Sequence, residues 1–187
     1  MIILVIGGSK SGKSSYAQKV TKVIAEDKDK LIYLATMKAS DLEDVKRIEK
    51  HIEDREEYNF QTIEKDKNIL DILDYVKEED TLLLESITSL MTNIMFTKEG
   101  IVNEVSEKIV NDIIKLKSKL KNIVLVSDYV FSDGIIYDEY TEKFREELGK
   151  INIEMAKISD VVIECSSGNI ICHKGREALS KINDEIY

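Results

Sequence analysis

The sequence predicts an α/β protein, in which helices flank a mainly parallel central sheet. Two observations lead to this prediction. Short apolar runs alternate along the chain with longer segments of helical periodicity. The runs are nearly continuous in apolar residues, as in strands buried on both faces of a parallel sheet. A length of 187 residues suits one domain with its own core, so we expect a single domain over residues 1–187.

The elements follow in order along the chain. Strands are expected at 2–6, 31–35, 81–84, 123–126 and 161–165, with an edge hairpin completed by 169–172. Helices are expected at 13–25, from Asp41 onward, and at 67–76, 86–96, 103–120 and 138–158. Each helix carries apolar residues three or four positions apart, which is the period of a helix with one buried side. The 86–96 segment is apolar enough to be either core or a subunit contact.

Composition narrows the function classes. The net charge of −9 and the lack of a Lys/Arg-rich run argue against nucleic-acid binding. An anionic ligand therefore needs a local cationic pocket. Two cysteines without a CxxC pair favour free thiols in a reducing compartment. No apolar stretch is long enough to span a membrane and no signal peptide is evident, so we expect a cytoplasmic protein.

The first strand leads into the most informative motif, Gly7-x4-Gly12-Lys13-Ser14. Glycines let the backbone curl so that successive N–H groups face phosphate oxygens, and the next helix begins with its positive dipole end there. Lys13 can bridge the β- and γ-phosphates. The motif predicts a P-loop NTPase-like sandwich and these nucleotide-binding residues: Gly7, Gly8, Ser9, Lys10, Ser11, Gly12, Lys13, Ser14 and Ser15.

A Mg²⁺ site is predicted from the same motif. The Ser14 hydroxyl is a typical ligand, and its partner should be an acid at the end of another buried strand. Glu85 follows three leucines in "DTLLLES" and fits that position. A strand-end carboxylate without a role is the alternative interpretation.

Other motifs are missing or ambiguous. The Asn-Lys-x-Asp signature of guanine-reading GTPases is absent, and so is an arginine-rich lid. On the helix after Asp41, His51 lies between Arg47 and Arg55 at i−4 and i+4. An imidazole there could attack phosphorus while the guanidiniums offset the developing charge. A surface histidine on a charged helix is the alternative.

Six segments in order resemble one family. They are "GGSKSGKS" at 7–14, "YLAT" at 33–36, the pattern Asp41, Glu43, Arg47, Ile48, His51, Arg55, then Thr62 with Glu64, the pattern Leu83, Leu84, Glu85, Thr88, Asn93, Phe96, and finally Phe144, Arg145, Gly149, Asn152. The chain is similar over nearly its whole length to the bifunctional adenosylcobinamide kinase / adenosylcobinamide-phosphate guanylyltransferase family of cobalamin biosynthesis.

The resemblance implies a mechanism and its residues. ATP or GTP phosphorylates adenosylcobinamide, and His51 then takes GMP from GTP as a phosphoramidate and passes it to the corrinoid phosphate. Thr36, Arg55, Glu64 and Glu85 are implied to contact the guanine nucleotide, and the assembly is implied to be a homotrimer. Glu64 also has a physical rationale, because a carboxylate accepts both N–H groups of guanine's Watson–Crick edge.

The resemblance fails after the fourth expected strand. Asp128 and Tyr129 stand where the family usually has Asn and Glu, and the loop 129–137 departs in length and composition. This loop could line the corrinoid pocket or a subunit contact. The general base stays open between Asp128 and Glu85. Two other functions also stay open: a P-loop small-molecule kinase without guanylyl transfer, and a nucleotide-binding module without chemistry.

Overall fold

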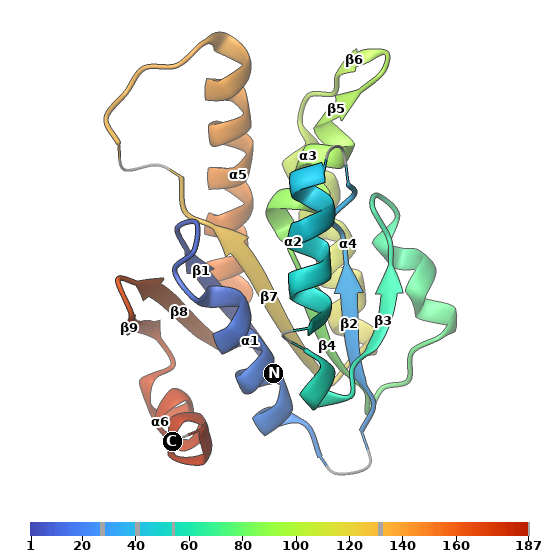
Figure 1. The fold of residues 1–187 in the computed structure, drawn as a ribbon, viewed down its shortest axis with the longest axis vertical. Helices are drawn as coiled ribbons and strands as arrows, with labels where there is room; N and C mark the ends of the chain where they lie inside the picture. Colours follow the sequence, from blue (N-terminus) through green and yellow to red (C-terminus); the bar gives the residue numbers. More distant parts are fainter. Residues whose placement is uncertain (27–28, 40–41, 54, 131–132, 187) are drawn as a thin grey trace.

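The computed structural model describes residues 1–26, 29–39, 42–53, 55–130 and 133–186. It confirms the expected class, with one seven-stranded sheet in the order β3-β2-β4-β7-β1-β8-β9 (Figure 1). All neighbouring pairs are parallel except β8 with β9. The strands are β1 (Ile2–Gly7), β2 (Leu31–Ala35), β3 (Gln61–Glu64), β4 (Thr81–Glu85), β7 (Asn122–Asp128), β8 (Val161–Ser166) and β9 (Asn169–Lys174).

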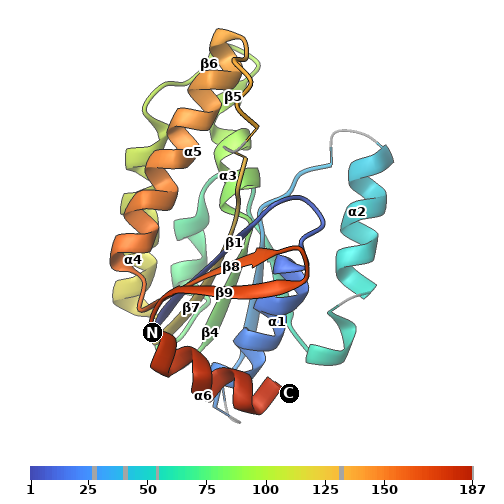
Figure 2. The ribbon, with the colours of Figure 1, turned by 90° about the vertical axis from the view of Figure 1, so that its left-hand side faces the viewer.

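Helices cover both faces of this sheet, as Figure 2 shows. One face carries α3 (Ile87–Met95), α4 (Val105–Lys119), α5 (Glu139–Ile158) and the 3₁₀ helix η2 (Ile69–Asp74). The other face carries α1 (Lys13–Ile24) and α6 (Arg176–Ile186). The strands are apolar on both sides because each face buries its own core, which is the reason their sequences do not alternate.

Three smaller elements complete the fold. The helix α2 (Leu42–Glu53) lies on the α1 side, away from the sheet (Figure 2). It is followed by the 3₁₀ turn η1 (Glu56–Tyr58). A two-stranded hairpin, β5 (Phe96–Thr97) with β6 (Gly100–Ile101), extends from the end of α3.

The structure corrects several expected elements. The 67–76 segment forms only the short η2. The segments that become β3, α6 and the β5–β6 hairpin were not expected as regular structure. β3 was missed because it is a four-residue edge strand whose residues are mostly exposed, so it lacks an apolar run. The spacing of Leu179 and Ile182, both buried in α6, was a usable signal.

The α3 segment is core. Ile87, Leu90, Met91 and Met95 have no exposed surface and join the cluster beneath α4 and α5. Ser86 caps the helix by accepting a hydrogen bond from the Ser89 backbone N–H at 3.2 Å. The alternative of a subunit contact through these four side chains is therefore excluded. Within the described residues, no helix is both long and apolar enough for a membrane span.

Candidate active site

The loop between β1 and α1 has the conformation that the phosphate-binding motif requires. Gly12 adopts a left-handed conformation, with φ 87° and ψ 4°, directly before the first residue of α1. The Tyr16 backbone N–H donates to the Gly12 carbonyl at 3.0 Å, which starts the helix. The free N–H groups of this first turn and the helix dipole both favour an anion at the loop.

Lys13 already has a negative partner in this structure. Its Nζ lies 2.7 Å from Oδ1 of Asp128 and donates to the Gly8 carbonyl at 3.2 Å. Lys13 is 9% exposed, so its charge is largely removed from water. A phosphate that enters the loop must replace the Asp128 carboxylate or share Lys13 with it.

Three hydrogen bonds hold the main chain at Asp128 in place. Its backbone N–H donates to Thr88 Oγ1 at 3.0 Å, and its carbonyl accepts from Asn152 Nδ2 at 3.2 Å. The next N–H, that of Tyr129, donates to the Gly7 carbonyl at 3.0 Å. The carboxylate is thereby fixed beside the loop at the end of β7, the strand next to β1. The sequence predicts Asp128 only as one of two alternatives for the general base, and its ion pair with Lys13 is a feature that the structure adds.

The expected metal pair, Ser14 and Glu85, is brought together. Ser14 Oγ donates to Glu85 Oε1 at 2.7 Å, while Glu85 Oε2 is buried and has no hydrogen-bond partner among the described residues. Burial raises the pKa of Glu85 to about 7, against the smaller opposing effects of the Ser14 hydrogen bond and the Lys13 charge. The nearby Asp128 charge adds to the rise.

This pair fits a Mg²⁺ ion. The unsatisfied Oε2 and the Ser14 hydroxyl are the hard oxygen atoms that Mg²⁺ prefers, and such sites are completed by substrate phosphates and water. Among the described residues, no three His, Cys, Asp or Glu side chains gather as a protein-only metal site. A site with one carboxylate and one hydroxyl agrees with that finding.

Strand register lines up the other expected site residues. Ala35 of β2 pairs with Glu64 of β3 on one side and with Glu85 of β4 on the other. Paired residues share a face, and Ala35 packs into the core on the α1 side. Glu64 and Glu85 therefore lie on the α1 face, about 10 Å apart across two strand spacings.

Arg55 lies over the same face, but not where it was expected. Arg55 lies in the turn between α2 (Leu42–Glu53) and η1, so it does not extend α2 by a further turn. Its guanidinium carbon is 4.2 Å from the centre of the Tyr33 ring, and its Nε donates to Thr62 Oγ1 at 3.2 Å. The Arg55 charge lowers the pKa of Glu85 slightly, opposing the effect of burial. Arg55 is 9% exposed.

Thr36 has no surface to offer a nucleotide in this structure. It is 0% exposed, and its hydroxyl donates to the Ser86 carbonyl at 2.7 Å and accepts from the Ser86 N–H at 2.8 Å. Its carbonyl accepts from Asn93 Nδ2 at 2.8 Å. Thr36 has a structural role here, because it ties the end of β2 to the end of β4.

The expected nucleophile is placed only by its backbone. His51 lies within α2, whereas its side chain and that of Arg47 lie outside the described residues. The apolar stripe expected on this helix is largely exposed, at 80% for Leu42, 39% for Val45 and 43% for Ile52. The stripe is therefore not part of either core.

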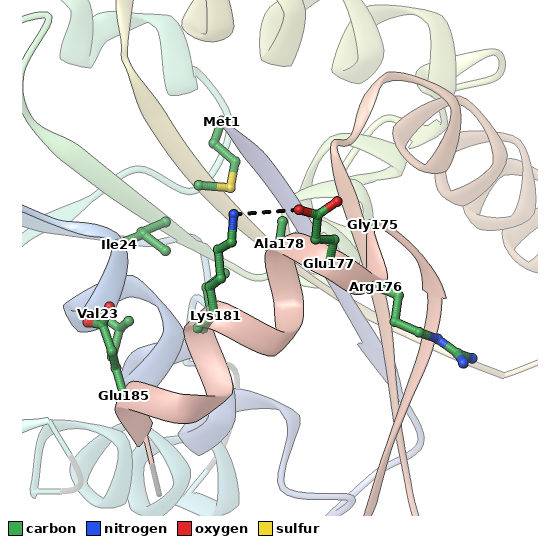
Figure 3. A pocket seen from close by; sticks show the side chains of 10 residues that line it. Met1, Val23, Ile24, Gly175, Arg176, Glu177, Ala178, Lys181 and Glu185 are labelled. Carbon is green, nitrogen blue, oxygen red and sulfur yellow. Dashed lines mark ion pairs between the residues drawn. The ribbon is translucent and has the colours of Figure 1, made fainter.

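A hollow in the described part of the molecule lies away from this site. It measures about 610 Å³ and is lined by Met1, the end of α1 and one side of α6. Figure 3 shows its walls, with Lys181 turned toward Glu177 at 3.7 Å. Because Met1 precedes β1 and Ile24 ends α1, this hollow is at the amino edge of the strands, opposite the phosphate loop. A smaller hollow of about 360 Å³ adjoins Asn93 and Phe96.

The mainly parallel sheet, the glycine loop before α1 and the Ser14–Glu85 pair define a P-loop nucleotide-binding protein. A family model for cobinamide kinase / cobinamide phosphate guanyltransferase (CobU) matches residues 3–172. The chain belongs to this family. It is thus a transferase of cobalamin biosynthesis with both kinase and guanylyltransferase activity.

Two curated relatives carry the same assignment. The chain is 26% identical over 180 residues to the bifunctional adenosylcobalamin biosynthesis protein CobU of Escherichia coli K12. It is 27% identical over 180 residues to the CobU protein of Salmonella typhimurium. In both cases the match covers 90% of this chain and 97% of the relative.

Similar solved structures are P-loop ATPases. The ATPase EscN of the enteropathogenic E. coli type III secretion system has a TM-score of 0.57 at 11% identity, covering 89% of this chain and 42% of EscN. A second solved ATPase domain has a TM-score of 0.51 at 11% identity, covering 94% of this chain and 77% of its own. These likenesses support the fold alone.

The two glycines of the loop should respond differently to alanine. A Cβ on Gly7 would lie 2.4 Å from Ser11 Oγ and 2.7 Å from the Cys165 carbonyl, whereas a Cβ on Gly8 meets nothing within 4 Å. We expect Gly7→Ala to weaken GTP binding at least tenfold and Gly8→Ala to change it less than threefold. Equilibrium titration with a fluorescent GTP analogue measures both. Equal losses would contradict the packing argument.

The raised pKa of Glu85 makes metal-dependent binding sensitive to pH. A pKa of about 7 leaves the carboxyl mostly protonated at pH 6 and mostly ionised at pH 8. We expect the Mg²⁺ dependence of GTP binding to strengthen roughly tenfold between pH 6 and pH 7.5, as measured by calorimetry. Glu85→Gln should remove this part of the pH dependence, and titration of the nucleotide itself should remain in that control. An unchanged profile in the variant would reject the assignment.

Proposed function

We propose that this enzyme phosphorylates the aminopropanol hydroxyl of adenosylcobinamide with ATP or GTP and then transfers GMP from GTP to the new phosphate. The observation that carries the proposal is the arrangement at the carboxyl edge of the sheet. The α1 face carries Lys13, the Ser14–Glu85 pair, Arg55 and Glu64. The helix α2, which includes His51, lies on that same side (Figure 2).

In the kinase step, the loop N–H groups and Lys13 hold the phosphates and offset their charge. A bound Mg²⁺ would supply further charge neutralisation at the β- and γ-phosphate oxygens, with Ser14 and Glu85 as its protein partners. The acceptor hydroxyl attacks the γ-phosphorus, the bond to the β-phosphate oxygen breaks, and the hydroxyl proton leaves. Asp128 must give up part of its contact with Lys13 when the triphosphate binds.

In the guanylyl step, neutral His51 attacks the α-phosphorus of GTP and pyrophosphate leaves. The product is a phosphoramidate between the imidazole and GMP. The corrinoid phosphate then attacks this phosphorus, which releases His51 and gives adenosyl-GDP-cobinamide. We propose that Arg55 neutralises negative charge at the α-phosphate, and its burial on the same face as the loop and the Ser14–Glu85 pair supports this role.

Glu64 is proposed to select guanine. It ends the edge strand β3, is exposed, and lies two strands away from Glu85 on the same face. A triphosphate anchored at the loop with its base directed toward β3 would present the base to this carboxylate. Guanine offers two N–H donors on its Watson–Crick edge, and adenine does not offer that pair.

The assembly and compartment belong to the same proposal. We propose a homotrimer in the cytoplasm, working on small-molecule substrates without nucleic acid. The exposed apolar stripe of α2, formed by Leu42, Val45 and Ile52, supports a subunit contact near the active site. Both cysteines, Cys165 and Cys172, are free thiols, which agrees with a reducing compartment.

The covalent intermediate can be trapped directly. With GTP labelled at the α-phosphate, we expect the protein to retain an acid-labile, base-stable label, and His51→Ala to abolish it. The kinase step with ATP should persist in this variant, because Lys13 and the loop are untouched. Lys13→Ala should impair both steps. A label that survives in His51→Ala would reject His51 as the nucleophile.

Base selection can be tested separately. Glu64→Gln keeps the side-chain shape but replaces one acceptor oxygen by an N–H₂ donor that faces guanine's donors. We expect the preference for GTP over ATP in protein labelling to fall at least tenfold. Glu57→Gln, in the nearby η1 turn, is a matched control that should leave the preference unchanged. An unaltered preference in Glu64→Gln would count against the assignment.

A further inference from the structure

The side chain of Arg55 rests on two residues that face each other across β2 and β3. Tyr33 and Thr62 are direct partners in the parallel register of these strands. The guanidinium lies 4.2 Å above the Tyr33 ring, and Nε donates to the Thr62 hydroxyl at 3.2 Å. Phe60 packs against the Tyr33 ring edge-on, with ring centres 5.9 Å apart, and so supports the ring from the side.

These two contacts together fix the orientation of the guanidinium. A guanidinium is planar, so stacking on Tyr33 sets the direction of its plane. Within that plane the ion could still rotate. The bond from Nε to Thr62 Oγ1 removes this freedom, since it directs one N–H group at a fixed acceptor on the sheet.

The backbone of Arg55 is held at both ends, because its N–H donates to the Ile52 carbonyl at 3.2 Å and its carbonyl accepts from the Tyr58 N–H at 3.1 Å, but these bonds do not orient the long side chain. Arg55 lies between α2 and the three-residue turn η1, outside both elements. The sheet is the rigid body nearby, and Thr62 and Tyr33 belong to it. Their contacts transfer the fixed geometry of the strands to a cation that the short connection alone would leave with several rotamers.

We propose that Thr62 is a positioning residue for guanylyl transfer, which acts by orienting Arg55 on the Tyr33 ring toward the α-phosphate of GTP. This inference rests on the proposed function of Arg55 in that step. Thr62 itself does not touch the reacting atoms. Replacing Thr62 should therefore slow guanylyl transfer. The same replacement should have no effect when residue 55 is not an arginine.

The test is a double-mutant cycle with a conservative control. Thr62→Val removes the acceptor while keeping the branched shape, and Thr62→Ser keeps the acceptor. Thr62 is exposed, so both variants should fold, and circular dichroism checks this. The measured quantities are the single-turnover rate of protein labelling from GTP, its GTP concentration dependence, and the kinase rate with ATP.

We expect Thr62→Val to slow labelling about tenfold or more at saturating GTP, as for loss of a hydrogen bond to a charged group. The half-saturating GTP concentration and the kinase rate should change less than threefold. Thr62→Ser should restore labelling to within about twofold of the parent. In the Arg55→Lys background, Thr62→Val should have no further effect, because lysine lacks the planar ion that Thr62 orients.

The outcomes separate the two levels of the argument. If Arg55→Lys and Arg55→Ala both label at the parent rate, the role proposed for Arg55 is wrong and the inference falls with it. If the Arg55 variants lose labelling while Thr62→Val keeps the parent rate, the inference alone is overturned. An equal loss of kinase activity, or an undiminished effect of Thr62→Val in the Arg55→Lys background, would also overturn it.

Discussion

The site depends on the parallel pairing of β2 with β3 on one side and with β4 on the other. That register places Ala35 between Glu64 and Glu85 and sets Tyr33 opposite Thr62. A shift of one residue in either strand pair would turn these side chains to the opposite face, where α3 and α4 pack. The alternating geometry of the strands therefore decides which polar groups face α1 and a nucleotide.

A second layer of polar side chains holds the strand ends in this register. Thr36 binds both backbone groups of Ser86, and Asn93 donates to the carbonyls of Thr36 and Asp66, at 2.8 and 3.1 Å. On the other side of the site, Thr88 and Asn152 hold Asp128. Strand ends leave backbone groups without sheet partners, and these side chains satisfy them.

Several of these hydrogen-bonding residues belong to the motifs that the chain shares with the family. Thr36, Thr88, Asn93 and Asn152 all come from its motifs, yet in this structure their side chains contact the backbone. A motif residue can thus contribute to the reaction indirectly, because it fixes the backbone that carries the reacting group. Thr62 extends the same logic from backbone to side chain, because it acts on a guanidinium.

The sequence was sufficient for the fold class because the signals there are local. A few consecutive residues are enough to recognise a glycine loop between an apolar run and a helix. The same holds for a continuous apolar strand that is buried on both faces. The Ser14–Glu85 pair was also predictable, since strand ends in a parallel sheet meet at one edge. The edge strand β3 was not, because its exposed residues carry no apolar pattern.

The interactions that escaped prediction join residues far apart in the chain. The Lys13–Asp128 pair depends on β7 lying next to β1. The order of strands in a sheet cannot be predicted from any single segment of the sequence. The expectation that Arg55 continues α2 was wrong, because Arg55 lies in the turn before η1 and neither Pro nor Gly in the sequence signals that turn. The Tyr33 ring beneath Arg55 could only be recognised once the register was known.

The charge arrangement explains why main-chain groups must do much of the binding. Among the described side chains, the cation of the phosphate loop already faces a carboxylate, because Lys13 contacts Asp128 at 2.7 Å. A triphosphate therefore meets an ammonium group that has a negative partner, in a chain whose net charge is −9. The dipole of α1 and the backbone N–H groups of a phosphate-binding loop favour an anion without a positively charged side chain.

The same arrangement gives the acidic groups a function. The Asp128 carboxylate pairs with the Lys13 ammonium group while no phosphate is present. This pairing matters because Lys13 is only 9% exposed, and an unpaired buried charge is costly. Glu85, whose pKa burial raises to about 7, reduces the corresponding penalty because it carries a proton for part of the time at neutral pH. Under the proposed function, a triphosphate that binds with Mg²⁺ would take over Lys13 from Asp128 and displace the proton of Glu85, so that the buried charges exchange their partners.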